Sequence, residues 1–256
     1  MAKLQIYQFP ALKDNYGYLV HDSATGATAA IDTPEVAAIL NALDTTGWRL
    51  THILNTHHHF DHAGGNAELK AKTGCTIIGP KGEKDLIPGI DRAVGEGDIV
   101  EVGSARARVI EVPGHTRGHV AYHFADDHVV FVGDTLFALG CGRLFEGTAA
   151  QMWTSLGKLM ALPDDTTVYC AHEYTQSNAR FALTVEPHNA ALVARASEID
   201  EKRARGEWTV PTTIALEKAT NPFLRAASAD LRATIGLTNA ADVDVFAETR
   251  ARKDKF

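Results

Sequence analysis

The sequence has few of the features that stabilise small secreted proteins or anchor membrane proteins. It contains only three cysteines, Cys75, Cys141 and Cys170, and they are far apart along the chain. An odd number of widely spaced cysteines is poor material for a disulfide framework, so we expect reduced thiols and a cytoplasmic protein. No apolar run approaches the ~18 residues of a membrane span. The opening MAKLQIYQFP also lacks the long apolar core of a signal peptide.

Positive charge is also scarce. The chain has 25 Lys and Arg against 32 Asp and Glu, which gives a formal net charge of −7. General nucleic-acid binders usually carry a basic face, so this balance argues against such a partner. The apolar and charged fractions are ordinary for a globular protein, and the length of 256 residues allows one large domain or two modest ones.

Short strand-like runs fill the first two-thirds of the chain, and helical spacing fills the rest. Strands that follow one another without intervening helices argue against a plain doubly wound fold, and they favour an α/β or α+β protein with two sheets possible. No convincing strand follows Tyr174, so we place a domain boundary there, between residues 1–173 and a helical domain of residues 174–256. The expected strands are Leu4–Phe9, Tyr18–Val20, Thr28–Ile31, His52–Asn55, Thr76–Ile78, Ile99–Val102, Arg106–Val112, Val120–Phe124, Val129–Val132 and Val168–Cys170. The expected helices are Pro34–Leu43, Asn66–Lys72, Met152–Leu162, Asn189–Arg205, Thr212–Ala219, Ala229–Ile235 and Ala241–Arg252.

The densest cluster of reactive side chains is the run THHHFDH at residues 56–62. It offers four good metal ligands, namely His57, His59, Asp61 and His62. Imidazole and carboxylate together suit zinc, iron or manganese. A structural zinc site is the alternative, but such sites usually close four tetrahedral ligands and often use cysteine, which is not at ligand spacing here. The run therefore predicts a metal-dependent hydrolase.

Three more apolar strands end in a residue that can bind a metal. They are ARVIEVPGH, ending at His115, HVVFVGD, ending at Asp134, and TVYCAH, ending at His172. If these strand ends converge, seven ligands are too many for one catalytic ion, which takes three plus water. Two ions suit this number if a carboxylate bridges them, and Asp134 is our choice because imidazole has only one nitrogen free for a metal. We expect His58 to face away from the cluster, and His119 to have a buried hydrogen-bonding role near it.

On these residues the sequence resembles the metallo-β-lactamase superfamily. The run THHHFDH matches the HxHxDH motif of that superfamily, and PGHTRGH, VGD and AHEY follow in the expected order. The resemblance implies an αββα sandwich with the metals at one edge. A closer resemblance, to the hydroxyacylglutathione hydrolase (glyoxalase II) family, extends over essentially the whole chain and includes GCGRLFEGT, HEYT, NPFLR and the ending ETRARKDKF.

The family resemblance also implies how the site is divided. Its ligand pattern assigns His57, His59 and His115 to one ion, Asp61, His62 and His172 to the second, and Asp134 to both. Zinc is the expected metal, with iron or manganese as alternatives. The helical domain would help to hold the glutathione portion of the substrate. Arg143 and Tyr174 match substrate-contact positions of the family, and Arg250 and Lys253 match the basic pair that reaches the glutathione carboxylate. Many members have Tyr where this chain has Phe145, which lacks the hydroxyl for a substrate hydrogen bond.

The implied reaction is hydrolysis of S-(2-hydroxyacyl)glutathione, typically S-D-lactoylglutathione, to glutathione and D-lactate, the second step of methylglyoxal detoxification. Asp61 and Asp134 are the expected catalytic residues, with Asp61 orienting the attacking hydroxide. The alternatives are a glutathione persulfide dioxygenase with a single iron, a nuclease and a scaffold without turnover. The full second set of ligands and the basic tail favour the hydrolase. We expect a monomer with no nucleic-acid or membrane partner.

Overall fold

The computed structural model describes residues 4–256, and the chain divides into two compact units. The first unit consists of the residues up to Glu111 together with Arg117–Gly133. The second unit consists of Val112–Thr116 and Asp134–Phe256. The domain boundary expected near residue 173 stays a prediction.

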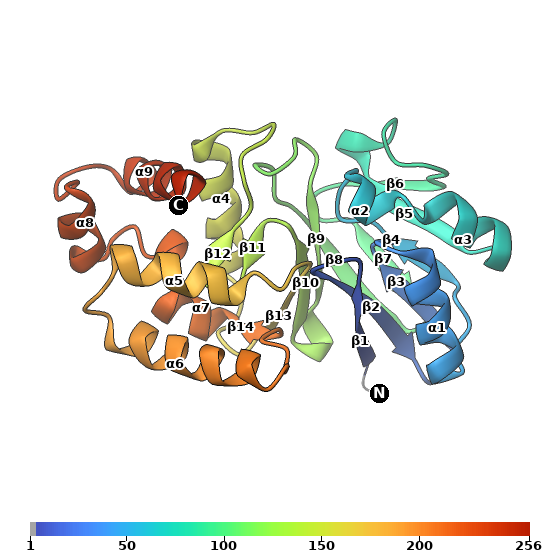
Figure 1. Ribbon diagram of the computed structural model, residues 1–256. Coiled ribbons are helices and arrows are strands. Elements are labelled where there is room, and N and C mark those ends of the chain that lie inside the picture. Colours follow the sequence, from blue (N-terminus) through green and yellow to red (C-terminus); the bar gives the residue numbers. More distant parts are fainter. Residues whose placement is uncertain (1–3) are drawn as a thin grey trace. The chain divides into compact units, whose positions relative to one another are not determined.

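A six-stranded sheet in the order β1-β2-β3-β4-β5-β6 opens the first unit (Figure 1). The first three strands pair antiparallel, and β3 to β6 pair in parallel. Parallel neighbours need a crossover, which α1 supplies between β3 and β4 and α3 supplies between β4 and β5. The strands are β1 (Gln5–Ala11), β2 (Asn15–Asp22), β3 (Ala27–Ile31), β4 (His52–Leu54), β5 (Thr76–Pro80) and β6 (Arg92–Val94). The helices are α1 (Val36–Thr46), α2 (Phe60–Ala63), α3 (Asn66–Thr73) and the 3₁₀ turn η1 (Lys81–Glu83).

Helices α1 and α3 lie beside this sheet (Figure 1), and apolar side chains join them to one of its faces. Leu19, Ile53 and Ile77 of the strands pack in one buried cluster with Ile39 of α1 and Leu69 of α3. Each of these five side chains is fully buried or nearly so. Burial of one such side chain stabilises the fold by roughly 1.5–3 kcal/mol, so this cluster fixes the strand ends from which the histidine run departs.

A second sheet covers the other face of the first sheet within the first unit. Its strands run antiparallel in the order β7-β8-β9-β10. The ring of Tyr18 on β2 lies 5.4 Å from that of Phe131 on β10, so aromatic side chains fill the space between the sheets. The elements are β7 (Ile99–Val102), β8 (Ala105–Glu111), β9 (Val120–Phe124), the 3₁₀ turn η2 (Ala125–Asp127) and β10 (Val129–Gly133).

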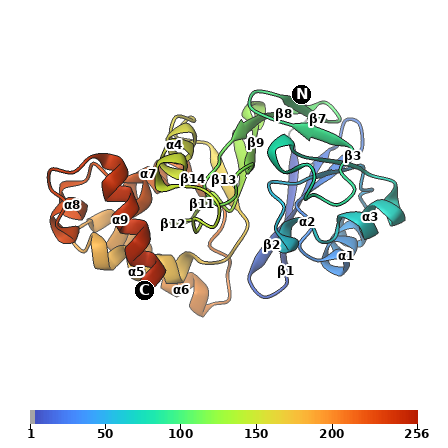
Figure 2. The ribbon, with the colours of Figure 1, turned by 90° about the horizontal axis from the view of Figure 1, so that it is seen from above.

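The second unit is mainly helical, as seen from above in Figure 2. Its strands are the hairpin β11 (Leu136–Phe137) and β12 (Gly140–Cys141), and β13 (Thr167–Cys170), which pairs with β14 (Thr212–Thr213). Its helices are α4 (Ala149–Met160), α5 (Thr175–Val185), α6 (Ala190–Ala204), α7 (Ile214–Thr220), η3 (Pro222–Leu224), α8 (Ala229–Ile235) and α9 (Asp242–Lys255).

Two expectations for this part of the chain were wrong. A strand, β14, does follow Tyr174, but two residues are too few to show a period of two. The helix expected over Thr212–Ala219 starts later, because the side chain of Thr213 caps α7 by accepting the N–H of Leu216.

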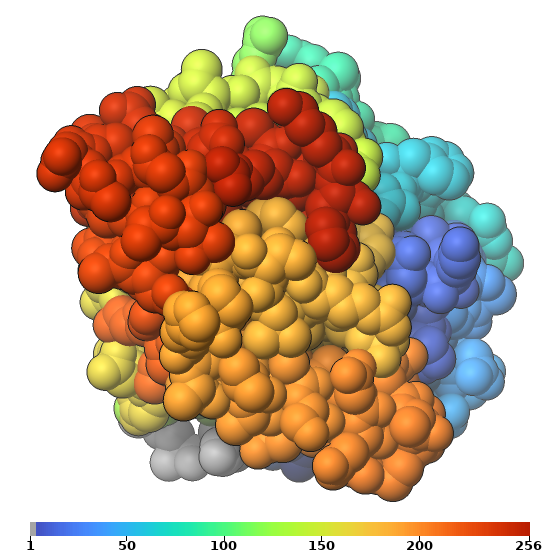
Figure 3. All heavy atoms as spheres, turned by 60° about the vertical axis from the view of Figure 1, so that its left-hand side comes forward, coloured from blue at the N-terminus to red at the C-terminus, as the bar shows by residue number. Residues whose placement is uncertain are grey.

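Aromatic rings form the core of the C-terminal helices. The ring centroid of Phe223 lies 5.9 Å from that of Phe181 on α5 and 6.2 Å from that of Phe246 on α9. The last residue, Phe256, packs its ring on Phe181, and in Figure 3 the dark red C-terminal end covers the gold atoms of this region. No helix between residues 4 and 256 combines the length and the apolar composition that crossing a membrane requires.

Candidate active site

The histidine run forms the loop after β4 and continues into α2 in the first unit. His57 is fully buried, and its Nε2 lies 3.0 Å from Nδ1 of His59. Nε2 of His62 lies 3.5 Å from Oδ2 of Asp61. Two donor atoms on one tetrahedral ion, each about 2.1 Å from it, lie about 3.4 Å apart. Both pairs therefore have the spacing of ligands that share an ion.

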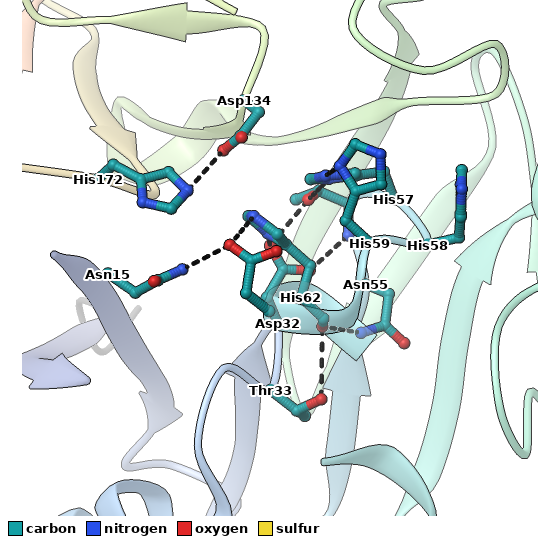
Figure 4. Close-up of polar contacts among 12 residues, drawn as sticks. Asn15, Asp32, Thr33, Asn55, His57, His58, His59, His62, Asp134 and His172 are labelled. Carbon is teal, nitrogen blue, oxygen red and sulfur yellow. Dashed lines mark hydrogen bonds and ion pairs between the residues drawn. The ribbon is translucent and has the colours of Figure 1, made fainter. Parts of the chain in front are cut away.

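Asp32, at the end of β3, orients two of these imidazoles from behind (Figure 4). Its Oδ2 lies 2.8 Å from Nδ1 of His62 and accepts a hydrogen bond from Oγ1 of Thr56, and its Oδ1 accepts the backbone N–H of Thr56. The Thr56 hydroxyl lies in turn 3.0 Å from Nδ1 of His57. A carboxylate that holds Nδ1–H leaves Nε2 as the nitrogen available to a metal. Our sequence reasoning gave Asp32 no role, although it ends a strand as the expected ligands do.

Further hydrogen bonds fix the backbone of this loop, as Figure 4 shows. The carbonyl of His62 accepts the N–H of Thr33 and the side-chain amide of Asn55, each at 2.8 Å. The amide of Asn15 donates to Oδ2 of Asp61 at 3.0 Å. Asp61 is therefore held in one orientation beside His62.

The two remaining histidines near the loop have other partners. Nδ1 of His58 lies 2.8 Å from Oε2 of the buried Glu83, which also accepts the backbone N–H of His58. His119 is fully buried and stacks on His57, with ring centroids 4.6 Å apart. Gly133 lets this ring approach, since a Cβ there would meet it at 2.8 Å. Both findings agree with the expected positions of His58 and His119.

Asp134 stands between two imidazoles in the second unit. Its Oδ2 lies 3.4 Å from Nε2 of His115, and its Oδ1 lies 3.4 Å from Nε2 of His172, a pair drawn in Figure 4. Each oxygen thus faces a different imidazole at the spacing of shared ligands, as a bridging carboxylate requires. Nδ1–H of His115 donates to the carbonyl of Arg143, which leaves Nε2 for a metal. Gly142 is needed here, since a Cβ would meet the Asp134 carbonyl at 2.0 Å.

A cavity of about 540 Å³ opens beside these residues in the second unit. His115 and Asp134 line it together with Arg143, Arg250 and Lys253. Its other lining residues are Phe137, Cys141, Phe145, Tyr174, Ser177, Asn178, Asp254 and Phe256. One cavity therefore combines two of the expected metal ligands with all four expected substrate contacts.

Aromatic rings cover the ligands on the cavity side. The ring of Tyr174 stacks on His172, with centroids 4.7 Å apart and planes 2° from parallel. Phe145 meets His115 edge to face at 5.2 Å and is 62% exposed, so its ring is available to a bound molecule. These contacts restrict how both imidazoles can turn.

The cations of the cavity differ in their surroundings. Arg250 is buried, and its guanidinium donates to the carbonyl of Cys141 at 2.8 Å and to Asp254 at 3.0 Å. Nζ of Lys253 lies 3.3 Å from the carbonyl and the hydroxyl of Ser177. Burial, with smaller contributions from Arg250 and Arg143, lowers the pKa of Lys253 to about 8. An anion bound beside Lys253 would restore its charge, as expected at a carboxylate subsite.

The Cys141 thiol is not a nucleophile. It is buried, and burial raises its pKa to about 11 in spite of the nearby Arg250 guanidinium. Cysteine attacks as the thiolate, which is a negligible fraction of such a thiol at neutral pH. These properties suit a packing role for Cys141 in the cavity wall.

Two family models together match most of this chain. Residues 14–172 match the family model described as the metallo-beta-lactamase superfamily, and residues 173–256 match that of the hydroxyacylglutathione hydrolase C-terminus. The fold is that of this superfamily, and the expected fold class is confirmed. Within it, the chain belongs to the hydroxyacylglutathione hydrolase family. It is 59% identical over 256 residues to the hydroxyacylglutathione hydrolase of Rhizobium meliloti (strain 1021), with 100% of each chain covered.

Two solved structures are similar over most of the chain. ETHE1 from Myxococcus xanthus is 28% identical, covers 97% of this chain and 98% of its own, and has a TM-score of 0.67. TTHA1623 in a di-iron-bound form is 26% identical, covers 86% of this chain and 100% of its own, and has a TM-score of 0.61. Both are far less similar to this chain in sequence than the Rhizobium meliloti hydroxyacylglutathione hydrolase. The match to that relative and to the C-terminal family model confirms the family resemblance expected from the sequence.

Proposed function

We propose that this protein is an enzyme that hydrolyses S-(2-hydroxyacyl)glutathione, S-D-lactoylglutathione above all, to glutathione and the 2-hydroxy acid. It would thereby catalyse the second step of methylglyoxal detoxification. The observation that carries this proposal is the cavity in which His115 and Asp134 lie beside Arg143 and Lys253. Glutathione carries two carboxylates, so cations in a cavity with metal ligands suit a thioester of this peptide.

We propose that two divalent ions are bound, with Asp134 shared between them. His57, His59 and His115 would hold one ion, and Asp61, His62 and His172 the other. The donor spacings of 3.0–3.5 Å within each unit fit this assignment, and the related TTHA1623 has been solved with two irons. Zinc is our choice, since three or four N and O donors suit it, while the same donors also suit iron and manganese.

The protein side chains have distinct tasks in this reaction. Divalent ions at such donors lower the pKa of water to about 7 and polarise a carbonyl oxygen. Asp61, oriented by the Asn15 amide, would accept the proton that the attacking water gives up and would direct the resulting hydroxide to the thioester carbon. The departing thiol has a pKa of roughly 8.5, so it can leave as thiolate without a general acid.

The substrate contacts follow from the cavity lining. Lys253 and Arg143 would pair with a carboxylate of glutathione, and Tyr174 would contact the substrate beside His172. Arg250 would add positive charge from within the wall, since Cys141 and Asp254 already accept its hydrogen bonds. Phe145 can give only an apolar contact, because it has no hydroxyl.

Metal analysis of the purified protein, together with a thioester hydrolysis assay, tests this function. We expect close to two ions per chain and D-lactate release from S-D-lactoylglutathione. A chelator should remove the ions and abolish this release. A fully loaded protein that leaves the thioester intact would refute the proposal. Oxygen uptake with glutathione persulfide at one iron per chain would instead support the dioxygenase.

We also propose that the protein works in the cytoplasm as a monomer. All three cysteines are buried free thiols, which suits a reducing compartment. Sedimentation at micromolar concentration should give a single species of 27.6 kDa, and a dimer would contradict the proposal.

A further inference from the structure

The hairpin of β11 and β12 forms one wall of the cavity, through Phe137 and Cys141, and it starts two residues after Asp134. Its tip is irregular. Leu139 has a backbone φ of +57°, a conformation that a residue other than glycine adopts only when its surroundings impose it. Leu139 is also fully buried in one apolar cluster with Ala182 of α5 and other residues of α5 and α6.

Buried side chains from the C-terminal helices hold the backbone of this hairpin. Oε2 of Glu217, which is fully buried on α7, accepts the N–H of Leu139 at 2.9 Å. The side-chain nitrogen of Asn221, also fully buried, lies 3.2 Å from the carbonyl of Phe137, 3.0 Å from that of Gly140 and 2.9 Å from Oε2 of Glu217. The strained tip and both strands of the hairpin are thus tied to two side chains.

A buried ion pair supports this arrangement. Arg195 of α6 lies 2.6 Å from Oε1 of Glu217, and the hydroxyl of Thr212 donates to the same oxygen at 2.7 Å. The other end of the Arg195 guanidinium donates to the hydroxyl of Thr220 at 2.6 Å. A buried ion pair adds little net stability over an apolar replacement, because desolvation offsets the attraction. Its value here is the fixed position it gives to the Glu217 carboxylate.

We propose that Asn221 and Glu217 are positioning residues for the substrate: they hold the β11–β12 hairpin so that its wall accepts the glutathione thioester. Among residues 4–256, those that line the cavity include neither side chain, so both act through the hairpin. The proposal rests on the proposed function for the identity of the ligand. The position of the wall itself does not depend on that function.

The test compares Asn221→Ala with Thr220→Val, in the full-length protein with its metals. Asn221→Ala removes the hydrogen bonds to Phe137 and Gly140, and KM for S-D-lactoylglutathione should rise about tenfold with kcat within about twofold, as expected for lost positioning of a binding surface. Thr220→Val is the matched control: it is equally buried and adjacent, and it bonds Arg195 but not the hairpin. It should lower thermal stability and leave KM unchanged. Asn221→Ser, a milder change, should shift KM in the same direction if the alanine variant folds poorly.

A second measurement is independent of catalysis. The Cys141 thiol lies in the hairpin wall, so its alkylation by iodoacetamide, located by mass spectrometry, reports on that wall. We expect Asn221→Ala to accelerate this alkylation at least tenfold and Thr220→Val to leave it unchanged. Equal KM values and equal alkylation rates in the two variants would overturn the proposal. If this protein hydrolyses no glutathione thioester but Asn221→Ala still accelerates the alkylation, the positioning role stands and the proposed function is refuted.

Discussion

Raising the pH from 7 to 9 should weaken substrate binding about tenfold, because Lys253 loses its proton in this range. Its Nζ lies near the rings of Phe181 and Phe256, at 5.4 and 5.1 Å, and burial with two nearby arginines brings its pKa to about 8. With this pKa the ammonium is ~90% populated at pH 7 and ~10% at pH 9, and only the ammonium pairs with a carboxylate.

The assay is the KM for S-D-lactoylglutathione between pH 6.5 and 9.5, in the wild type and in Lys253→Arg. Arginine stays charged throughout this range, so the KM of the Lys253→Arg variant should not follow the pH dependence of the wild-type KM. The metals and the substrate titrate identically in both proteins, and the ratio of the two KM values therefore isolates Lys253. Lys253→Met should raise KM at pH 7 and remove the dependence. Parallel profiles for wild type and Lys253→Arg would refute the reasoning.

Stability should respond to pH in the opposite sense. The pKa of Lys253 is lowered in the folded protein, from 10.5 to about 8, so between these values the unfolded chain binds more protons. Stability contributed by this group therefore rises with pH across that window. Weaker binding accompanied by a falling melting temperature would indicate general alkaline unfolding instead.

Three further outcomes follow from the site. Asp134→Ala should lose both ions and activity together, and retention of two ions by metal analysis would disprove its bridging role. Asp32→Asn should weaken metal binding roughly 10- to 100-fold in a chelator competition, because it disturbs the orientation of His62; wild-type affinity would show that Asp32 only stabilises the fold. Arg250→Ala should raise KM more than it lowers kcat in steady-state assays, and an unchanged KM would remove Arg250 from substrate binding.

The expected ligands could be read from the sequence because each follows an apolar strand. Strands such as Val129–Gly133 are recognisable by their runs of β-branched residues, and a strand end is where a scaffold can hold a reactive group. Asp32 has the same position after Ala27–Ile31. Nothing local shows that it faces His62, which is 30 residues away, so its role depended on tertiary structure.

The environment of the C-terminal tail was not predictable either. ETRARKDKF reads as a solvated charged helix end, and periodicity cannot show that Arg250 is buried against Cys141, 109 residues earlier. The short strand β14 and the helix Thr175–Val185 also escaped the sequence reasoning. The buried face of this helix includes the polar residues Thr175 and Asn178, so its stripe is not apolar throughout, and its packing on Phe223 and in the Leu139 cluster depends on tertiary structure.

The hydrogen bond from His115 to residue 143 ends on a main-chain oxygen, so the imidazole is held by an atom that every amino acid possesses. The side chain at that position can therefore be exchanged, Arg for Lys or either for a neutral group, while the tether of the imidazole persists. Substitutions at position 143 can in this way change how strongly an anionic group is held in the cavity while His115 keeps its orientation, and engineered changes of that affinity should begin there.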